Sequence, residues 1–449
     1  MPRLLTILLI FLGFPLFALD VPVSRITDDS QLRLRIRDNW FLETPATVLT
    51  RRPAVEQLPS GDRVEVRAVN GRDEIMILLS RENSQGQFPG WIQGSWMLTR
   101  RRDTGAGVLI RIFLRSDQYS YIQFRPLNAD RAQMDVVLYG AYMVRSLPVA
   151  VPFERLYTMQ LNDILRLAGD KFPSQYFNPD PALYRDTRNF ITQVRGRIGE
   201  LRYADDGAID ENGNYIFIET LQRQTSAAGV NCSGFAKWLI DGCLRPVTGR
   251  RLSIEPLKMP FGDRGSSFTA NWENNPNQGI EIPLEHRRDP HFGLDWIRNL
   301  ASEANGTLRA SSHSTLEEFE VRTDNFSLIE NRNSVISNYP GFLPEAGYGF
   351  EGLHALLYTL AIENPFSFYL AAINNEIGAA ITAQNPRGAP RLRQYYHIAA
   401  LIPYFDEAGN FRVVVFESAT ESSFSGFNRR YPGHYINLVE IPVPSRFDP

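Results

Sequence analysis

A series of short β-rich runs from about residue 27 to residue 152 constrains the fold of this 449-residue chain most strongly. Turn residues separate the runs, as in "NGRD" and "RRDTGAG". Short strands at regular spacing with such turns are typical of a β-sandwich or a small β-barrel. We therefore predict a β-rich domain over residues 19–152. The clearest runs are "DRVEVRAV", "EIMILLS", "GVLIRIFLR", "YSYIQFRPL" and "MDVVLYGAYMV".

The stretch "PGWIQGSWML" places two tryptophans, Trp91 and Trp96, near a turn of this domain. Indole rings at a surface stack on sugar rings, whereas bulky aromatic side chains in β domains are more often part of the core. The pattern favours the core, and glycan contact stays open as the other role.

Helical spacing of apolar residues begins near residue 153, where we place the domain boundary. Segments 153–170 and 184–200 both have this spacing, and the proline-rich "FPSQYFNPDPAL" joins them. The second domain is predicted over residues 153–449, with an insertion at about 250–345.

Three later segments complete the predicted fold class, which is α+β. "LDWIRNLASEA" is the clearest helix of the insertion. "GFEGLHALLYTLAIENPFSFYLAAINNEIGAAI" is interpreted as a helical pair with a break at Pro365. "RLRQYYHIAALIPYFDEAGNFRVVVFESATESS" has the pattern of strand, turn and strand.

The chain begins with "MPRLLTILLIFLGFPLFALDVP", in which Arg3 precedes an apolar run from Leu4 to Ala18. A charged residue, an apolar stretch and a small residue at the cut predict a secretory signal peptide over residues 1–18. The run is shorter than the roughly 20 apolar residues of a membrane span, and an uncleaved anchor is the alternative. We expect an exported protein, periplasmic or associated with the cell envelope, without a membrane span after cleavage.

The sequence argues against a nucleic-acid partner and against a calcium site. The formal net charge of −3 disfavours a nucleic-acid partner, because general nucleic-acid binders carry a strongly basic face. The acidic phrase at 210–219 partly matches a calcium loop, but Ala208 stands at the first ligand position. The phrase recurs at 406–411, so we interpret both copies as hairpin turns with a left-handed glycine. The sequence predicts no metal site.

The two cysteines of the chain, Cys232 and Cys243, lie in "AAGVNCSGFAKWLIDGC". If Cys232 begins a helix, a rise of about 1.5 Å per residue separates them by roughly 13–16 Å. That exceeds the ~7 Å Cα limit of a disulfide. An unbridged cysteine in an oxidising compartment is a candidate nucleophile.

Cys232 stands where a loop turns into a helix, after Asn231, a good N-cap residue. The unpaired N–H groups and positive dipole end of a helix lower the pKa of a thiol. The small residues Ser233 and Gly234 are expected to leave room for a substrate backbone. We predict Cys232 as the nucleophile, and the alternative is a small buried side chain without chemistry.

A thiolate nucleophile needs a base, usually a histidine oriented by a third polar group. His397 opens a strand whose hairpin partner carries Glu417 in "VVVFESA". A three-residue loop at 407–409 makes Glu417 the diagonal neighbour of His397, about 7–8 Å away at Cα. A four-residue loop puts Glu417 on the other face. We predict the shorter loop, with Glu417 orienting His397; the alternative for Glu417 is an edge-strand residue in solvent. The other histidines are His286, His291, His313, His354 and His434.

"NCSGFAKW" resembles the "(D/N)CSG(F/L)" nucleophile motif of the NlpC-type, papain-like cysteine peptidases of bacteria. In that family the cysteine opens a helix, a histidine opens a later strand, and a third polar residue lies on the adjacent strand. Cys232, His397 and Glu417 have the same order and element types. The family also uses a tyrosine upstream of the cysteine, for which Tyr203 and Tyr215 are both candidates.

The resemblance implies a papain-like domain, with the helix that carries the cysteine packed on an antiparallel sheet. It implies an exported hydrolase that cleaves amide bonds in peptidoglycan stem peptides without metal or cofactor, often behind a β-rich wall-binding domain. The match covers roughly residues 200–245 and 385–425. The histidine strand has "HIAAL" where the family has "HVGIY", and the long gap before it requires the insertion.

Two other function classes remain open at this stage. A transglutaminase-like enzyme uses the same Cys-then-His order with an aspartate, and Asp406 lies in the predicted turn. A catalytically degenerate, envelope-associated binding protein is the alternative that is not an enzyme.

Overall fold

The computed structural model describes residues 22–261, 289–309, 315–322, 327–328, 342–343, 346–377 and 392–449. The predicted signal peptide and the histidines at 286 and 313 lie outside the described residues. The chain divides into two compact units, which are Met1–Tyr139 with Met143–Asn178, and Gly140–Tyr142 with Pro179–Pro449. Among the described residues, no helix is long and apolar enough to cross a bilayer.

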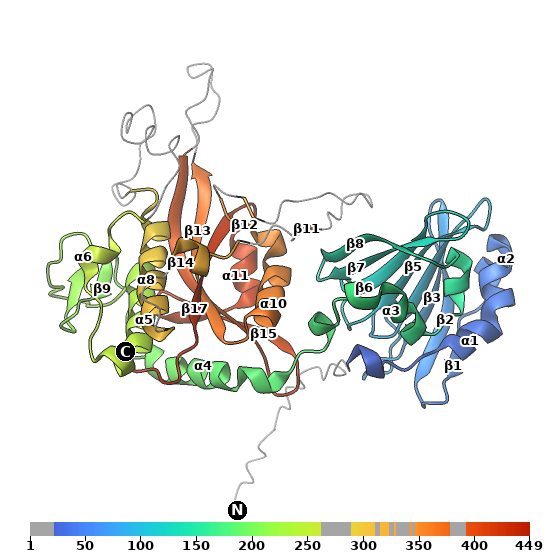
Figure 1. The fold of residues 1–449 in the computed structure, drawn as a ribbon, viewed down its shortest axis with the longest axis horizontal. Helices are drawn as coiled ribbons and strands as arrows, with labels where there is room; N and C mark the ends of the chain where they lie inside the picture. The colour runs from blue at the N-terminus through green and yellow to red at the C-terminus, as the bar shows by residue number, and fades with distance from the viewer. Residues whose placement is uncertain are drawn as a thin grey trace, which may run out of the picture. The chain divides into compact units, whose positions relative to one another are not determined.

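The eight strands of the first unit belong to one antiparallel sheet, in which each strand pairs with the next along the chain (Figure 1). This differs from the predicted sandwich, because the strands extend a single layer instead of forming two. Within the described residues β1 pairs only with β2, so the sheet is not closed as in a barrel. The strands are β1 (Ala54–Gln57), β2 (Arg63–Asn70), β3 (Glu74–Arg81), β4 (Trp96–Arg101), β5 (Gly107–Phe113), β6 (Tyr121–Pro126), β7 (Ala132–Leu138) and β8 (Ala141–Val149).

Helices precede this sheet where the sequence predicted strands alone. The apolar residues Leu32 and Ile36 of α1 (Ser30–Ile36) are buried at helical spacing. Thr44 caps α2 (Pro45–Thr50) by accepting a hydrogen bond from the N–H of Thr47. The first unit is therefore mixed α and β, not all-β.

The first unit extends to Asn178, beyond the predicted boundary near 153. The segment after that boundary forms η3 (Phe153–Tyr157) and α3 (Leu161–Ala168). A Cβ built on Gly107 of β5 would lie 2.0 Å from the Tyr157 hydroxyl, so this glycine allows η3 to pack directly on the sheet. The helical pattern of the segment was predicted; its attachment to the first sheet was not.

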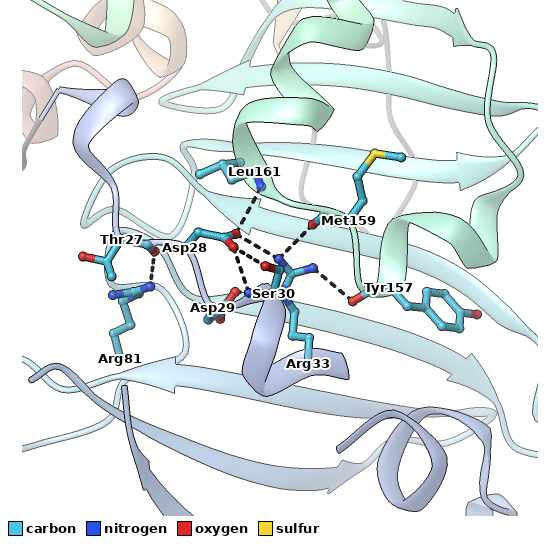
Figure 2. A network of polar contacts seen from close by, with 9 residues as sticks. All are labelled: Thr27, Asp28, Asp29, Ser30, Arg33, Arg81, Tyr157, Met159 and Leu161. Carbon is cyan, nitrogen blue, oxygen red and sulfur yellow. Dashed lines mark hydrogen bonds and ion pairs between the residues drawn. The ribbon is translucent and has the colours of Figure 1, made fainter. Parts of the chain in front are cut away.

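A buried arginine, Arg33, connects α1 to the start of α3 (Figure 2). Its Nε lies 2.7 Å from Oδ1 of Asp29, and a second guanidinium nitrogen pairs with Asp28. The same group donates to the backbone carbonyls of Tyr157 and Met159 at 3.0 Å and 2.9 Å. The planar, five-donor guanidinium is needed to satisfy all four acceptors at once.

We expect Arg33→Lys to lower the free energy of unfolding by about 2 kcal/mol, because an ammonium keeps the charge but loses charge-assisted hydrogen bonds. Denaturant unfolding of the whole chain, followed by circular dichroism, measures the change. Arg35→Lys is the matched control, since Arg35 forms an exposed pair with Glu56. Equal losses in both variants would contradict the structural role of Arg33.

The two tryptophans of "GWIQGSW" have different environments. Trp96 is 5% exposed, and the Arg33 guanidinium lies 3.5 Å from its ring centroid. Trp91 is 37% exposed. The core interpretation therefore holds for Trp96, and Trp91 is the one of the two whose ring is accessible.

The second unit contains a six-stranded antiparallel sheet in the order β12-β17-β13-β14-β15-β16 (Figure 1). One face carries the main apolar cluster, to which α4, α5 and α8 contribute together with alternate residues of β13 and β14. On the other face, Tyr358 of α10 packs against Phe405 and Phe411. The elements are α4 (Arg185–Ile198), α5 (Cys232–Thr248), α8 (Phe292–Leu308), α10 (Leu353–Glu363), β12 (Tyr348–Gly349), β13 (Ser367–Ile377), β14 (Leu392–Phe405), β15 (Phe411–Glu417), β16 (Thr420–Ser423) and β17 (Tyr435–Pro442).

The segment after Pro365 is the strand β13, and its interpretation as a second helix is wrong. β13 pairs with β14 on one side and β17 on the other. Phe368, Tyr369, Leu370 and Ala371 are all buried, because helices cover both faces of this central strand. A strand buried on both faces has a continuous apolar run without alternation, which periodicity does not distinguish from a buried helix.

Smaller elements surround this core. The hairpin of β9 (Gly207–Ile209) and β10 (Tyr215–Phe217) packs beside α5, and its turn contains Gly213 at φ 83°. Asp210 accepts hydrogen bonds from the N–H groups of Asn212 and Asn214, so the acidic phrase is a turn, as predicted. The remaining short helices are α6 (Ile254–Leu257), α9 (Leu316–Phe319) and α11 (Phe424–Arg430), whereas the short strand β11 (Ser327–Leu328) pairs with β8.

Candidate active site

Cys232 is the first residue of α5 and is partly exposed. The Asn231 side chain caps the helix by accepting from the N–H of Gly234 at 2.9 Å. The N–H of Asn231 donates to the carbonyl of Gly207, which fixes the helix start on the β9 hairpin. The thiol is therefore held at the N-terminal end of a helix whose body is buried, as the sequence predicted.

The other cysteine, Cys243, is fully buried in the same helix, and neither cysteine forms a disulfide. Burial raises the pKa of the Cys243 thiol well above its ordinary value. Its side chain belongs to the apolar cluster. Cys243 is a structural residue, and the two cysteines have different chemical environments.

The hairpin of β14 and β15 has the register predicted for a three-residue loop. The ladder runs from Ala400 opposite Phe416 to Phe405 opposite Phe411, and Gly409 is left-handed at φ 81°. This register puts Glu417 on the same face as His397. The Nε2 atom of His397 lies 2.8 Å from Oε2 of Glu417, so the predicted pair is in contact.

Cys232 interacts with the other side of the same imidazole. Since Nε2 of His397 faces Glu417, Nδ1 is the ring nitrogen left for the sulfur. Burial raises the pKa of the Cys232 thiol, but hydrogen bonds from His397 and the N–H of Ile398, with the charge of His397, bring it below its ordinary value. Burial lowers the pKa of His397, but its hydrogen bonds with Cys232 and Glu417 and the charges of these two groups raise the pKa to about 9. These opposite shifts favour a thiolate–imidazolium pair.

Glu417 is buried, and two further side chains hold its carboxylate. Oε1 accepts hydrogen bonds from the hydroxyl of Ser422 on β16 and from the guanidinium of Arg430, the last residue of α11. Burial raises the pKa of Glu417, but its contacts with His397, Ser422 and Arg430 lower it to about 2. Glu417 is therefore an anion at neutral pH and does not lie in solvent at a sheet edge.

A tight turn brings Ser422 to this carboxylate. Ser418 and Ala419 connect β15 to β16, and both are left-handed, at φ 46° and 65°. Residues other than glycine adopt this conformation at a cost. The sequence did not indicate Ser422 and Arg430, because their contacts with Glu417 depend on this turn and on the path of α11. The only local signal was "ESS", which follows an apolar strand.

A cleft of about 410 Å³ contains the thiol and the imidazole. Two of the residues that were predicted to bind substrate, Tyr203 and Ser233, also line this cleft. The described residues along the cleft are Tyr203, Asp205, Asp206, Glu219, Asn231, Cys232, Ser233, Asp289, Phe292, Gly293, Gln394, Tyr395, Tyr396, His397, Ile398 and Ser418.

Tyr203 is the upstream tyrosine that the structure places at the cleft; Tyr215 lies on β10 and is not among the described lining residues. The Tyr203 hydroxyl donates to the carboxylate of Asp205. Gly234 also differs from the prediction. A Cβ built on it would lie 2.0 Å from the carbonyl oxygen of Gly207, so this glycine allows α5 to approach the β9 hairpin instead of making room for substrate.

The described histidines other than His397 have other environments. His291 precedes α8 and lies beside the ring of Tyr395, and His354 stacks on Phe411. In the described part of the chain, no group of three or more His, Cys, Asp and Glu side chains is arranged to hold a metal ion. Asp406, the aspartate of the transglutaminase-like alternative, accepts hydrogen bonds from the N–H groups of Ala408 and Asn410 in the turn.

A model of the family described as "Domain of unknown function (DUF8515)" matches residues 22–176. This range covers most of the first unit and contains none of Cys232, His397 and Glu417. No curated protein and no solved structure matches the chain. The family match therefore concerns the first unit, and the candidate active site lies outside it.

Proposed function

We propose that this protein is an exported cysteine hydrolase that cleaves amide bonds in peptidoglycan stem peptides. The proposal depends on one observation: Cys232, His397 and Glu417 interact in series, and the first two line a cleft. The resemblance of "NCSGFAKW" to the NlpC-type motif supports the substrate class and a papain-like fold. A helix that begins with cysteine and packs on an antiparallel sheet agrees with that fold.

Acylation begins when the Cys232 thiolate attacks the substrate carbonyl carbon. A C–S bond forms, and the π electron pair of the carbonyl moves onto oxygen. The N–H of Cys232 is one of the helix N–H groups without an intrahelical acceptor and is available to the oxyanion. When the tetrahedral intermediate collapses, the C–N bond breaks and His397 transfers its Nδ1 proton to the leaving amine.

Deacylation returns the enzyme to its starting state. Water attacks the thioester carbonyl and gives a proton to His397, the C–S bond breaks, and the acid leaves. The sum is amide plus water giving acid plus amine. Glu417 holds the imidazole so that Nδ1 faces the sulfur throughout the reaction. Ser422 and Arg430 contribute indirectly, because they hold the carboxylate of Glu417.

We expect the protein to release stem-peptide fragments from purified peptidoglycan, as measured by mass spectrometry of the soluble products. Cys232→Ala should release none, whereas Cys243→Ala, the matched control on the same helix, should retain cleavage. Fragment release by Cys232→Ala would contradict the mechanism. If the wild-type protein releases no fragments although its Cys232 is reactive, peptidoglycan is not the substrate.

A further inference from the structure

Tyr396 is an extra residue in strand β14, next to His397. In the pairing with β13, Ile373 faces His397 and the following residue, Asn374, faces Tyr395, so Tyr396 has no partner in the ladder. Such a bulge redirects side chains, and bulges are frequent beside active sites. Consecutive residues of a regular strand point to opposite faces. Here the rings of Tyr396 and His397 both lie against Tyr431, at centroid distances of 6.5 Å and 6.2 Å, so the bulge puts them on the same side.

The turn after α11 holds both rings. Tyr431, the first residue after the helix, lies against His397, and His434 reaches Tyr396. The Tyr396 hydroxyl oxygen is 2.7 Å from Nδ1 of His434. The Tyr431 ring also contacts His434, at a centroid distance of 5.8 Å, so one short segment supports the base and the neighbouring tyrosine.

The direction of the hydrogen bond determines what Tyr396 offers to a ligand. Burial lowers the pKa of His434 and so favours the neutral form of its ring. In a neutral pair the imidazole nitrogen is the better acceptor and the phenol O–H the more acidic donor, so Tyr396 donates to His434. The phenol oxygen then keeps its lone pairs for another donor. Tyr396 lines the cleft and is 37% exposed, so that donor can come from a bound substrate.

We propose that Tyr396, held by His434, binds substrate by accepting a hydrogen bond from a backbone N–H close to the scissile carbonyl. Substrates with a secondary amide at this place are then favoured over those that lack the N–H. This role rests on the proposed function, because it assumes that the carbonyl is attacked by Cys232. Tyr396 is a specificity residue and takes no part in bond breaking.

The test uses two peptide probes, N-acetyl-alanyl-alanyl chloromethyl ketone and its analogue methylated on both amide nitrogens. The Cys232 thiolate displaces chloride from either probe, forming a thioether. Tyr396→Phe should raise the KI of the unmethylated probe about five- to tenfold, the effect of one neutral hydrogen bond. The KI of the methylated probe should be the same in wild type and variant, and the limiting rate of inactivation should not change.

Two further variants keep the result interpretable. Tyr404→Phe removes the same oxygen from the same strand but outside the described cleft lining, and should leave KI unchanged. His434→Leu removes the acceptor that holds the phenol and should raise the KI of the unmethylated probe without changing the limiting rate. An equal KI for wild type and Tyr396→Phe overturns the role of Tyr396. Failure of both probes, with iodoacetamide reacting no faster at Cys232 than at Cys243, overturns the proposed function itself.

Discussion

Iodoacetamide at pH 7 should alkylate Cys232 up to about 30 times faster in the wild-type protein than in His397→Ala. An ordinary thiol with a pKa of about 8.5 is only a few per cent thiolate at this pH, whereas full ionisation gives a gain of this size. His397 supplies the interactions that lower the pKa of Cys232, and its own pKa of about 9 keeps it charged. Removing the imidazole removes its hydrogen bond and its charge, whereas burial, which raises the pKa of the thiol, remains.

Mass spectrometry of tryptic peptides measures this rate site by site, because Lys237 lies between the two cysteines and trypsin separates them. Cys243, buried and with a raised pKa, is the internal control and should remain unlabelled. Equal labelling of Cys232 in wild type and His397→Ala would contradict the ion pair.

The ratio of the two rates should depend on pH in a definite direction. His397 holds its proton until the pH rises through about 9, so the wild-type advantage persists through neutral pH. It should vanish above that value, because the thiol of the variant is then ionised as well. As the pH falls through the lowered pKa of Cys232, both rates should decline in proportion and the ratio should reach a constant maximum, because each thiol is then mostly protonated.

The second large effect is on stability. Asp241→Ala should lower the free energy of unfolding of the second unit by about 3–5 kcal/mol, because it leaves a buried ammonium without its partner. Nζ of Lys237 lies 2.6 Å from Oδ2 of Asp241, and both side chains are essentially inaccessible, at 0% and 1% exposure. Oδ1 of Asp241 also accepts from the N–H of Leu252, a contact that the substitution removes.

Cys243 reports on this unit directly. Because it is buried, an iodoacetamide pulse at increasing urea concentration should label it only when the second unit unfolds. Glu255→Ala is the control, since it breaks the exposed pair of Glu255 with Lys258 and should cost less than about 1 kcal/mol. Lys237→Met combined with Asp241→Leu should recover most of the loss. A midpoint for Asp241→Ala equal to that of the control would show that the pair does not stabilise the unit.

The sequence predicted the parts of the site that depend on local patterns. The N-cap and helix start at Cys232 follow from residues adjacent to it, and the position of Glu417 follows from the length of one turn. The pairing of His397 with Glu417 needed no tertiary information beyond this hairpin.

The sequence did not predict features that depend on contacts between distant segments. Arg430 reaches Glu417 only because α11 folds back over β15 and β16, and nothing near Arg430 indicates a carboxylate partner. The bulge at Tyr396 exists only relative to β13, a strand that was itself misinterpreted as a helix because both its faces are buried. The attachment of η3 to the first sheet depends on Gly107, many residues earlier.

The length of the exposed turn at 407–409 affects the catalytic site, because it sets the strand register that places Glu417 beside His397. Loop tips of this kind usually accept insertions and deletions, because they contribute little to packing. Here the number of residues in the turn, odd or even, decides on which face Glu417 emerges. A single added residue would turn the carboxylate away from His397 while leaving every catalytic side chain in the sequence. Insertions in this loop should therefore preserve the site only when they add an even number of residues.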